Sequence, residues 1–137
     1  MFKTVLWATD GSETAALALP YALDLAEPDK TKLVVVHVRE IFVGRGGGYP
    51  VLADESELRE QIALQVKGLR EGGLDATFVV RTCTGGHAAR TIAEIAKEVG
   101  ADLIVVGNKG IARRVFGSVP SAIAREAPCN VLIAKTT

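Results

Sequence analysis

Cysteine is scarce in this sequence, and neither sign of charge predominates. Its 137 residues include two cysteines, Cys83 and Cys129, which are too few for a disulfide scaffold and do not form a C-x-x-C pair. We expect both to be buried free thiols in a reducing compartment. Sixteen Lys and Arg balance sixteen Asp and Glu, so no overall field attracts nucleic acid or an anionic membrane.

Long hydrophobic runs are also missing. No apolar stretch approaches the roughly 20 residues that a membrane-crossing helix needs, and the N-terminal Met-Phe-Lys sequence is charged too early for a secretory signal. We therefore expect a cytoplasmic protein with no membrane partner. The length predicts a single domain, residues 1–137, with a substantial core.

Residues that usually carry catalysis or bind metals are few. His37 and His87 are the only histidines, and together with the two separated cysteines they have no recognisable zinc spacing. No G-x-S-x-G elbow accompanies a Ser-His-Asp set. We interpret His37 as a packed, hydrogen-bonded residue near a strand end and His87 as a solvated residue at a helix start. We expect neither catalytic residues nor a metal site of the protein itself; any magnesium would enter with the phosphates of a ligand.

Short apolar runs alternate with helical patterns along the whole chain. We expect strands at 4–9, 32–38, 76–82, 102–106 and 130–134, because continuous apolar runs are typical of strands buried on both faces. Helical spacing predicts helices from Ser12, as N-cap, to Ala26, and at 58–69, 88–99 and 119–127. This alternation predicts a doubly wound α/β fold, a five-stranded parallel sheet with helices on both faces.

Two segments interrupt these patterns. Pro20 lies inside the first helical pattern, which predicts a kink or the loss of one hydrogen bond. Residues 39–50 lose their periodicity and include four glycines between 44 and 48. We expect a mobile loop there, close to the longest that a compact domain carries. It is either a plain surface loop or a lid over a site.

A glycine-rich stretch from Gly107 to Ser118 follows the fourth predicted strand, with the sequence Gly-Asn-Lys-Gly-Ile-Ala-Arg-Arg-Val-Phe-Gly-Ser. Glycines let backbone N–H groups approach a ligand closely, and the helix start beyond them supplies unpaired donors and a positive dipole end. Lys109, Arg113 and Arg114 add positive charge. The stretch is neither a Walker loop nor G-x-G-x-x-G, so these residues alone leave phosphate binding and a plain turn as open alternatives.

The ends of two predicted strands indicate where a ligand would bind. In doubly wound sheets, ligands bind beyond the C-terminal ends of the strands, at the point where strand order reverses. The first strand ends in Thr9-Asp10-Gly11 and the fourth in Gly107-Asn-Lys-Gly110. If these strands are neighbours at the reversal, both loops face one crevice, which would accommodate a nucleotide.

In combination, these motifs resemble those of the universal stress protein family. The matching segments span nearly the whole chain: Ala8-Thr-Asp-Gly-Ser12, Val36-His-Val38, Gly85-Gly86, Ala101 to Gly107, Gly110, Gly117-Ser118 and Ala127-Pro-Cys-Asn-Val-Leu132. The resemblance implies a parallel sheet of strand order 3-2-1-4-5 and, commonly, a homodimer formed along the last strand. It also implies adenine-nucleotide binding in members that carry G-x2-G-x9-G-S/T.

The resemblance also implies roles for individual residues. Ala8, Thr9 and Asp10 would line the nucleoside pocket, with Asp10 near the ribose. Val38 would meet the adenine through its backbone. The phosphates would be held by Gly107, Gly110, Gly117, Ser118 and Val119, beside the basic side chains of Lys109 and Arg113.

One spacing departs from the family pattern. Six residues, 111–116, separate Gly110 from Gly117, where the pattern has nine. The shorter loop would still hold a triphosphate, prefer fewer phosphates, or have lost the site. Because the glycines and three basic side chains are kept, we favour retained anion binding. The ligand would be ATP or another adenine nucleotide, such as AMP or cyclic AMP.

We therefore expect a stress-response protein that acts as a nucleotide-dependent switch rather than an enzyme. Two alternatives stay open. One is an interaction or dimerisation module that binds no nucleotide. The other is a slow ATP hydrolase in which Asp10 and magnesium assist the reaction.

Overall fold

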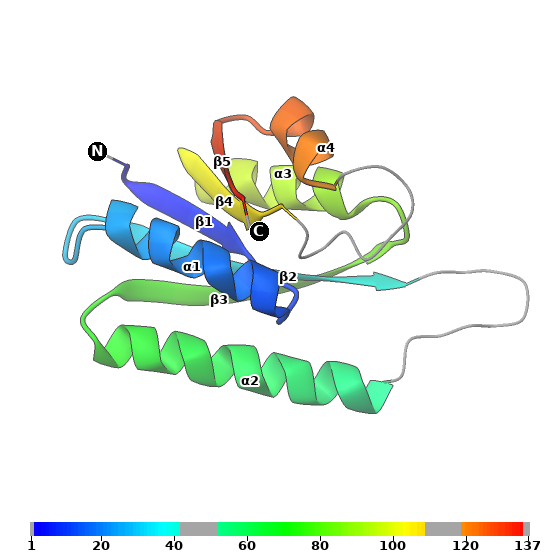
Figure 1. The fold of residues 1–137 in the computed structure, drawn as a ribbon, viewed down its shortest axis with the longest axis horizontal. Helices are drawn as coiled ribbons and strands as arrows, with labels where there is room; N and C mark the ends of the chain where they lie inside the picture. The colour runs from blue at the N-terminus through cyan, green and yellow to red at the C-terminus, as the bar shows by residue number, and fades with distance from the viewer. Residues whose placement is uncertain (1, 42–51, 109–118, 136–137) are drawn as a thin grey trace, which may run out of the picture.

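The computed structural model of the protein describes residues 2–41, 52–108 and 119–135. Within these ranges, strands and helices alternate from one end to the other (Figure 1). The elements are β1 (Thr4–Ala8), α1 (Glu13–Leu25), β2 (Lys32–Ile41), α2 (Leu52–Glu71), β3 (Asp75–Thr84), α3 (Ala88–Val99), β4 (Leu103–Gly107), α4 (Val119–Glu126) and β5 (Asn130–Ala134).

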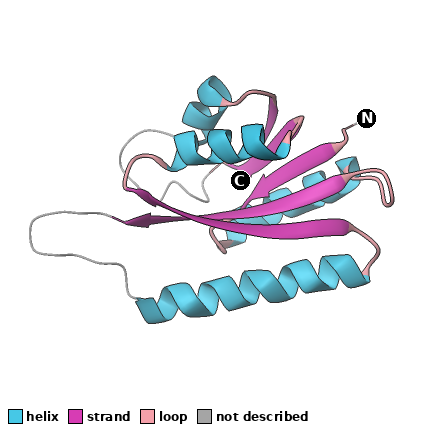
Figure 2. Cartoon of the chain, turned by 180° about the vertical axis from the view of Figure 1, so that it is seen from behind, coloured by secondary structure: helices cyan, strands magenta, loops and turns pink. Residues whose placement is uncertain are grey.

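The strands form one parallel sheet of order β3-β2-β1-β4-β5. Helices α1 and α2 cover one face, and α3 and α4 cover the other (Figures 1 and 2). The predicted doubly wound fold and strand order are confirmed. Sequence order reverses between the neighbouring strands β1 and β4, so the C-terminal ends of these two strands form the ligand-binding edge expected of this fold.

The core has two layers because both faces of the sheet are covered. Successive side chains of a strand point to opposite faces. In β1, Val5 and Trp7 therefore pack under α1 and α2, whereas Leu6 and Ala8 pack under α3 and α4. This explains why the strands read as continuous apolar runs rather than as alternating ones.

The sequence signals for helix ends are confirmed at two positions. Ser12 caps α1, and its Oγ accepts a hydrogen bond from the Ala15 N–H at 3.2 Å. Gly100 ends α3 in the left-handed conformation, with φ of +69°. Pro20 does not end α1, which continues to Leu25. Its ring is exposed at the helix surface.

Strand β2 is longer than predicted. Residues Arg39 to Ile41, which we expected to begin the loop, instead pair with β3 from Thr82 to Thr84. Their side chains are half-buried, and their sequence, Arg-Glu-Ile, lacks the apolar run that marks the central strands. Backbone pairing with β3 therefore extends the strand. The remainder of the predicted loop, residues 42–50, lies outside the described residues. Helix α2 also begins earlier than predicted, at Leu52 rather than at residue 58.

The predicted full burial of the two cysteines is wrong. Cys83 and Cys129 are free, but they are half-buried rather than buried. Partial burial still raises the pKa of each thiol above its ordinary value. Burial therefore disfavours the thiolate form, which is the reactive form of cysteine.

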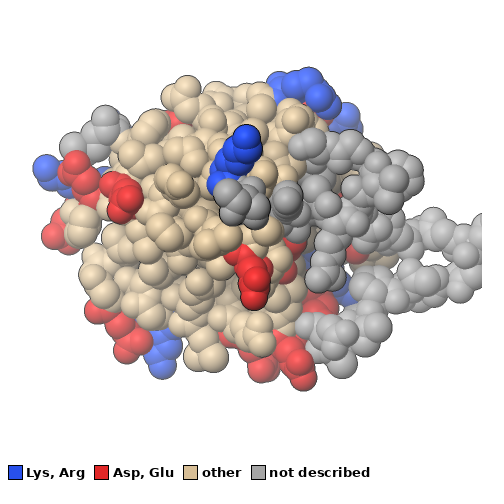
Figure 3. Space-filling model, viewed as in Figure 1, with Lys and Arg blue, Asp and Glu red and all other residues tan. Residues whose placement is uncertain are grey.

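Charged side chains are dispersed on the face that carries α1. In the view of Figure 3, Lys and Arg lie among Asp and Glu, mostly around the rim, and both basic and acidic side chains also lie near the centre. None of the helices among the described residues is both long and apolar enough to cross a membrane.

We expect Asp102→Ala to destabilise the fold by about 1–3 kcal/mol at neutral pH, because Asp102 ties the start of β4 to β1. Its carboxylate accepts hydrogen bonds from the Lys3 and Thr4 N–H groups at 2.9 and 3.0 Å. Burial opposes the charged form, but the backbone hydrogen bonds outweigh it and hold the pKa of Asp102 below its ordinary 3.8. Urea unfolding of the variant and the wild type measures the difference.

The pH dependence follows from the sign of this shift. A carboxyl group whose pKa is lowered by folding stabilises the folded state fully at pH values above its unfolded pKa. This contribution is lost as the pH falls through the pKa of the group in the folded protein. The difference in free energy of unfolding between the wild type and Asp102→Ala should therefore shrink below pH 3.8. Asp75→Ala, at an exposed site, serves as the control. A loss of stability in Asp102→Ala that is equally large in acid and at neutral pH would contradict a stabilising role for the ionised carboxylate.

Candidate functional site

The candidate site lies at the edge where β1, β2 and β4 end. Strand β1 stops at Ala8, and the Thr9 N–H continues its pairing by donating to the Val36 carbonyl oxygen of β2 at 2.9 Å. On the other side, β1 pairs with β4 from Val5 to Trp7. The turn after β1 therefore lies at the point where strand order reverses, as predicted.

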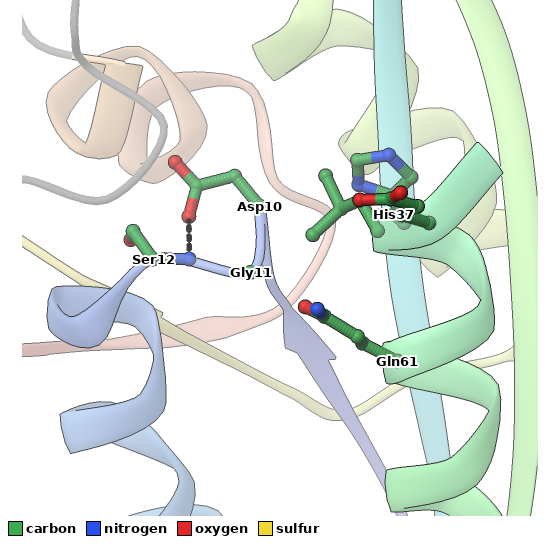
Figure 4. A pocket seen from close by; sticks show the side chains of 7 residues that line it. Asp10, Gly11, Ser12, His37 and Gln61 are labelled. Carbon is green, nitrogen blue, oxygen red and sulfur yellow. Dashed lines mark hydrogen bonds between the residues drawn. The ribbon is translucent and has the colours of Figure 1, made fainter. Parts of the chain in front are cut away.

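The turn from Thr9 to Ser12 is held by its own side chains. The Gly11 N–H donates to Thr9 Oγ1 at 3.0 Å, and the Ser12 N–H donates to Asp10 Oδ1 at 2.9 Å. Gly11 has a φ of +80°, a conformation that glycine adopts without strain. Figure 4 shows the second carboxylate oxygen of Asp10 pointing away from Ser12, so one oxygen orders the turn and the other can accept a hydrogen bond from a ligand.

A cavity of about 420 Å³ opens between this turn and α2. Its lining comes from the turn, from β2 and from α2, namely Asp10, Gly11, Ser12, His37, Glu57, Leu58 and Gln61. Figure 4 shows Gln61 extending from α2 toward Gly11. The lining includes two carboxylates and no Lys or Arg. It therefore suits hydroxyl and amino groups better than phosphates.

Leu58 brings α2 directly onto the turn. A Cβ placed on Gly11 would lie 2.0 Å from Leu58 Cδ1, so the leucine occupies the space that any other side chain would need. The absence of a side chain at position 11 thus serves both the turn and the close approach of α2.

His37 is buried and hydrogen-bonded, as predicted. Its Nδ1 lies 3.1 Å from the Thr9 carbonyl oxygen, and its Nε2 lies 2.9 and 3.1 Å from the two carboxylate oxygens of Glu55. The structure adds that this residue also lines the cavity. His87 is exposed just before α3, with Nδ1 3.1 Å from Thr84 Oγ1, in agreement with the prediction of a solvated residue.

Some of the predicted site residues lie among the described residues, in or just after β1, β2 and β4. These are Ala8 and Thr9, both buried, Asp10 and Val38, both half-buried, and Gly107. Gly107, the last residue of β4, lies close against the first turn of α1, because a Cβ on it would lie 2.6 Å from the Thr14 carbonyl oxygen. Of these residues, Asp10 alone lines the cavity.

The predicted phosphate-binding residues Lys109, Gly110, Arg113, Gly117 and Ser118 lie outside the described residues, and Val119 is the first residue of α4. The phosphate cradle therefore stays a prediction. Among the described residues, no group of three or more His, Cys, Asp or Glu could hold a metal ion.

Sequence reasoning missed the side chains that α2 contributes. Glu57 and Gln61 are exposed helix residues, and no motif marks them. Their spacing of four places them on one helical face. The apolar residues Ile62 and Val66 of the same helix are buried.

Comparisons with known proteins agree with this geometry. The sequence model of the universal stress protein family matches residues 1–135. The universal stress protein YxiE of Bacillus subtilis is 32% identical over 151 aligned residues, which cover 98% of this chain and all of YxiE.

Two solved structures are similar over nearly their whole lengths. A universal stress protein in complex with cAMP is 28% identical, with 99% of each chain covered and a TM-score of 0.65. The universal stress protein from Archaeoglobus fulgidus in complex with dAMP is 26% identical, with 97% of each chain covered and a TM-score of 0.69. In sequence and in fold, the chain belongs to the universal stress protein family.

Proposed function

We propose that this protein binds an adenine nucleotide at the C-terminal edge of the sheet, with the nucleoside beside Asp10. The cavity between the Asp10 turn and α2 carries the proposal, because it borders the turn that follows β1, where strand order reverses. Similar proteins bound to cAMP and to dAMP support it. The volume of about 420 Å³ lies in the range of small-molecule sites.

Asp10 supplies the acceptor for the ribose. A carboxylate accepts hydrogen bonds from hydroxyl groups, and charged acceptors form the stronger bonds of this kind. Because one oxygen of Asp10 is held by the Ser12 N–H, the carboxylate is oriented before a ligand arrives. Such preorganisation reduces the loss of side-chain entropy on binding.

Val38 supplies backbone groups for the base. The Val36 carbonyl oxygen faces β1, where it accepts from Thr9, and alternate residues of a strand present their backbone groups to the same neighbour. The backbone groups of Val38 therefore face the space beyond the end of β1. We propose that they bind an adenine edge, the role implied by the family resemblance.

The phosphates would extend toward the loop that follows Gly107. Its residues Lys109, Gly110, Arg113, Gly117 and Ser118 would provide N–H donors and positive charge, ahead of the first turn of α4. We propose ATP as the ligand, with magnesium bound through its phosphates. AMP and cyclic AMP are the competing ligands, because this loop is three residues shorter than the family pattern.

We further propose that nucleotide binding acts as a stress-response switch in a cytoplasmic homodimer. The dimer would form along β5, the edge strand beside β4. Val131 and Leu132 are half-buried in this strand and Ile133 is 39% exposed. An apolar edge strand of this kind favours pairing with a second chain.

We expect Asp10→Ala to weaken nucleotide binding about tenfold or more, because one hydrogen bond to a charged group contributes about 1.5–3 kcal/mol. Equilibrium dialysis with ATP, ADP, AMP and cyclic AMP measures the affinity and ranks the ligands. Asp75→Ala, which removes an exposed carboxylate at the start of β3, is the control and should bind like the wild type. A wild-type protein that binds none of the four nucleotides would refute the proposed function.

A further inference from the structure

We propose that His37 and Glu55 form a positioning pair that holds α2 in place as the wall of the nucleotide pocket. His37 joins the carbonyl of Thr9, the residue after β1, to the carboxylate of Glu55. The ligand-binding part of this inference rests on the proposed function. Neither residue carries a role in the site predicted from the sequence.

The partners of the two ring nitrogens determine their protons. Nδ1 lies 3.1 Å from the Thr9 carbonyl oxygen, which only accepts hydrogen bonds, so Nδ1 donates. Nε2 lies 2.9 and 3.1 Å from the carboxylate oxygens of Glu55. A bare lone pair on Nε2 would be repelled by an ionised carboxylate at these distances. A proton between Nε2 and the carboxylate removes this repulsion and forms a hydrogen bond.

Burial makes the pair sensitive to the loss of either partner. The side chains of His37 and Glu55 are 4% and 11% exposed. Removing His37 would leave the Glu55 carboxylate poorly solvated and without this partner, which is far more damaging than the loss of an exposed pair. The other charged groups nearby are Asp10 and Glu57, which line the same cavity, and Arg39, two residues further along β2.

The pair acts on the pocket through α2. Glu55 lies one turn before Leu58, which packs on Gly11. Both contacts therefore hold the first half of α2 against the turn that carries Asp10, and Figure 4 shows His37 and Gln61 across the pocket from this turn. Releasing the pair would move Glu57 and Gln61 away from Asp10.

Nitrogen NMR of the His37 ring tests the pair without any ligand. We expect a hydrogen-bonded Nδ1–H in the folded wild type, because Nδ1 faces the Thr9 carbonyl oxygen. In Glu55→Gln the carboxylate that faces Nε2 is replaced by an amide, so the Nε2 signal should shift. A wild-type ring without a hydrogen-bonded Nδ1–H, or a ring spectrum unchanged in Glu55→Gln, would overturn the assignment.

Nucleotide affinity tests the positioning role. We expect His37→Gln and Glu55→Gln each to weaken binding of the tightest-binding nucleotide about tenfold. Because the two residues act together, the double variant should bind no more weakly than the single variant with the lower affinity. Glu98→Gln is the matched control. This change removes the ion pair between Arg81 of β3 and Glu98 of α3, in which Nη1 and Oε2 are also 2.9 Å apart. It should leave the nucleotide affinity unchanged.

The two proposals fail in different ways. If the wild type binds none of the nucleotides, the proposed function fails, whereas the ring spectrum still decides the state of the pair. If the wild type binds and folded His37→Gln and Glu55→Gln bind equally well, the positioning role fails while the proposed function stands. If neither single variant folds, the wild-type ring spectrum remains decisive for the pair.

Discussion

Trp7→Ala is expected to destabilise the protein by about 3–5 kcal/mol, the usual cost of removing a large aromatic side chain from a core. Trp7 is completely buried on the central strand, in the cluster that joins the sheet to α1 and α2. Its indole Nε1–H also donates to the Ala15 carbonyl oxygen of α1 at 3.1 Å. Since domains of this size are stable by about 5–15 kcal/mol, this single change removes a large share of the total.

Urea unfolding followed by circular dichroism measures this effect, because the variant lacks the only tryptophan of the chain and so loses its fluorescence probe. Trp7→Phe should cost less, since it keeps an aromatic ring in the core and loses mainly volume and the indole donor. Tyr21→Ala, where the side chain is 49% exposed on α1, should change stability by less than about 1 kcal/mol. Equal losses in Trp7→Ala and Tyr21→Ala would contradict the central role of Trp7.

Gly107→Ala is expected to have the second largest effect, a loss of about 1–3 kcal/mol typical of overpacking. The added Cβ would lie 2.6 Å from the Thr14 carbonyl oxygen and 3.1 Å from its carbonyl carbon. Both are backbone atoms in the first turn of α1, so no side-chain rotation relieves the clash. Either β4 or α1 must shift, and both border the proposed nucleotide site.

Thermal or urea unfolding checks this prediction, and Gly68→Ala supplies the control. Gly68 lies within α2, and a Cβ there would meet nothing within 4 Å. Alanine at this site should stabilise the helix by about 0.5–1 kcal/mol. The two glycine-to-alanine changes should therefore have opposite signs. A Gly107→Ala protein as stable as the wild type would show that the strand end and the helix are not in close contact.

The order of strands and helices was predictable because its signals are local. The apolar run from Leu33 to Val36 predicts a strand buried on both faces, and all four residues are buried. Ser12 and Gly100 mark helix ends through their own backbone and side-chain chemistry. The alternation of these elements is enough to predict the doubly wound fold.

The parts that were missed depend on contacts between distant residues. Arg39 to Ile41 form a strand because β3 is there to pair with them, and their own sequence has no apolar pattern. Glu57 and Gln61 line the cavity because α2 packs across the turn after β1, about 50 residues earlier in the chain. Sequence spacing places such residues on one helical face, but it does not indicate which loop that face meets.

His37 shows the same limit within a correct prediction. Its position in a strand predicted a packed, hydrogen-bonded side chain, which is confirmed. The identity of its partner depends on the path of α2, and Glu55 lies 18 residues further along the chain. The polar pair at the pocket therefore became visible only in the folded structure.

The central claim is that an adenine nucleotide binds at the edge formed by the ends of β1, β2 and β4. Titration of ¹⁵N-labelled protein with the tightest-binding of ATP, ADP, AMP and cyclic AMP, followed through backbone amide signals, tests it most directly. We predict saturable shifts centred on Thr9, Asp10, Gly11 and Val38, with little change at β3 or α3. Saturation without shifts at these four residues, or shifts centred on a second pocket, which is lined by Arg90 and Glu94 of α3 and by Glu126 of α4, would contradict the claim.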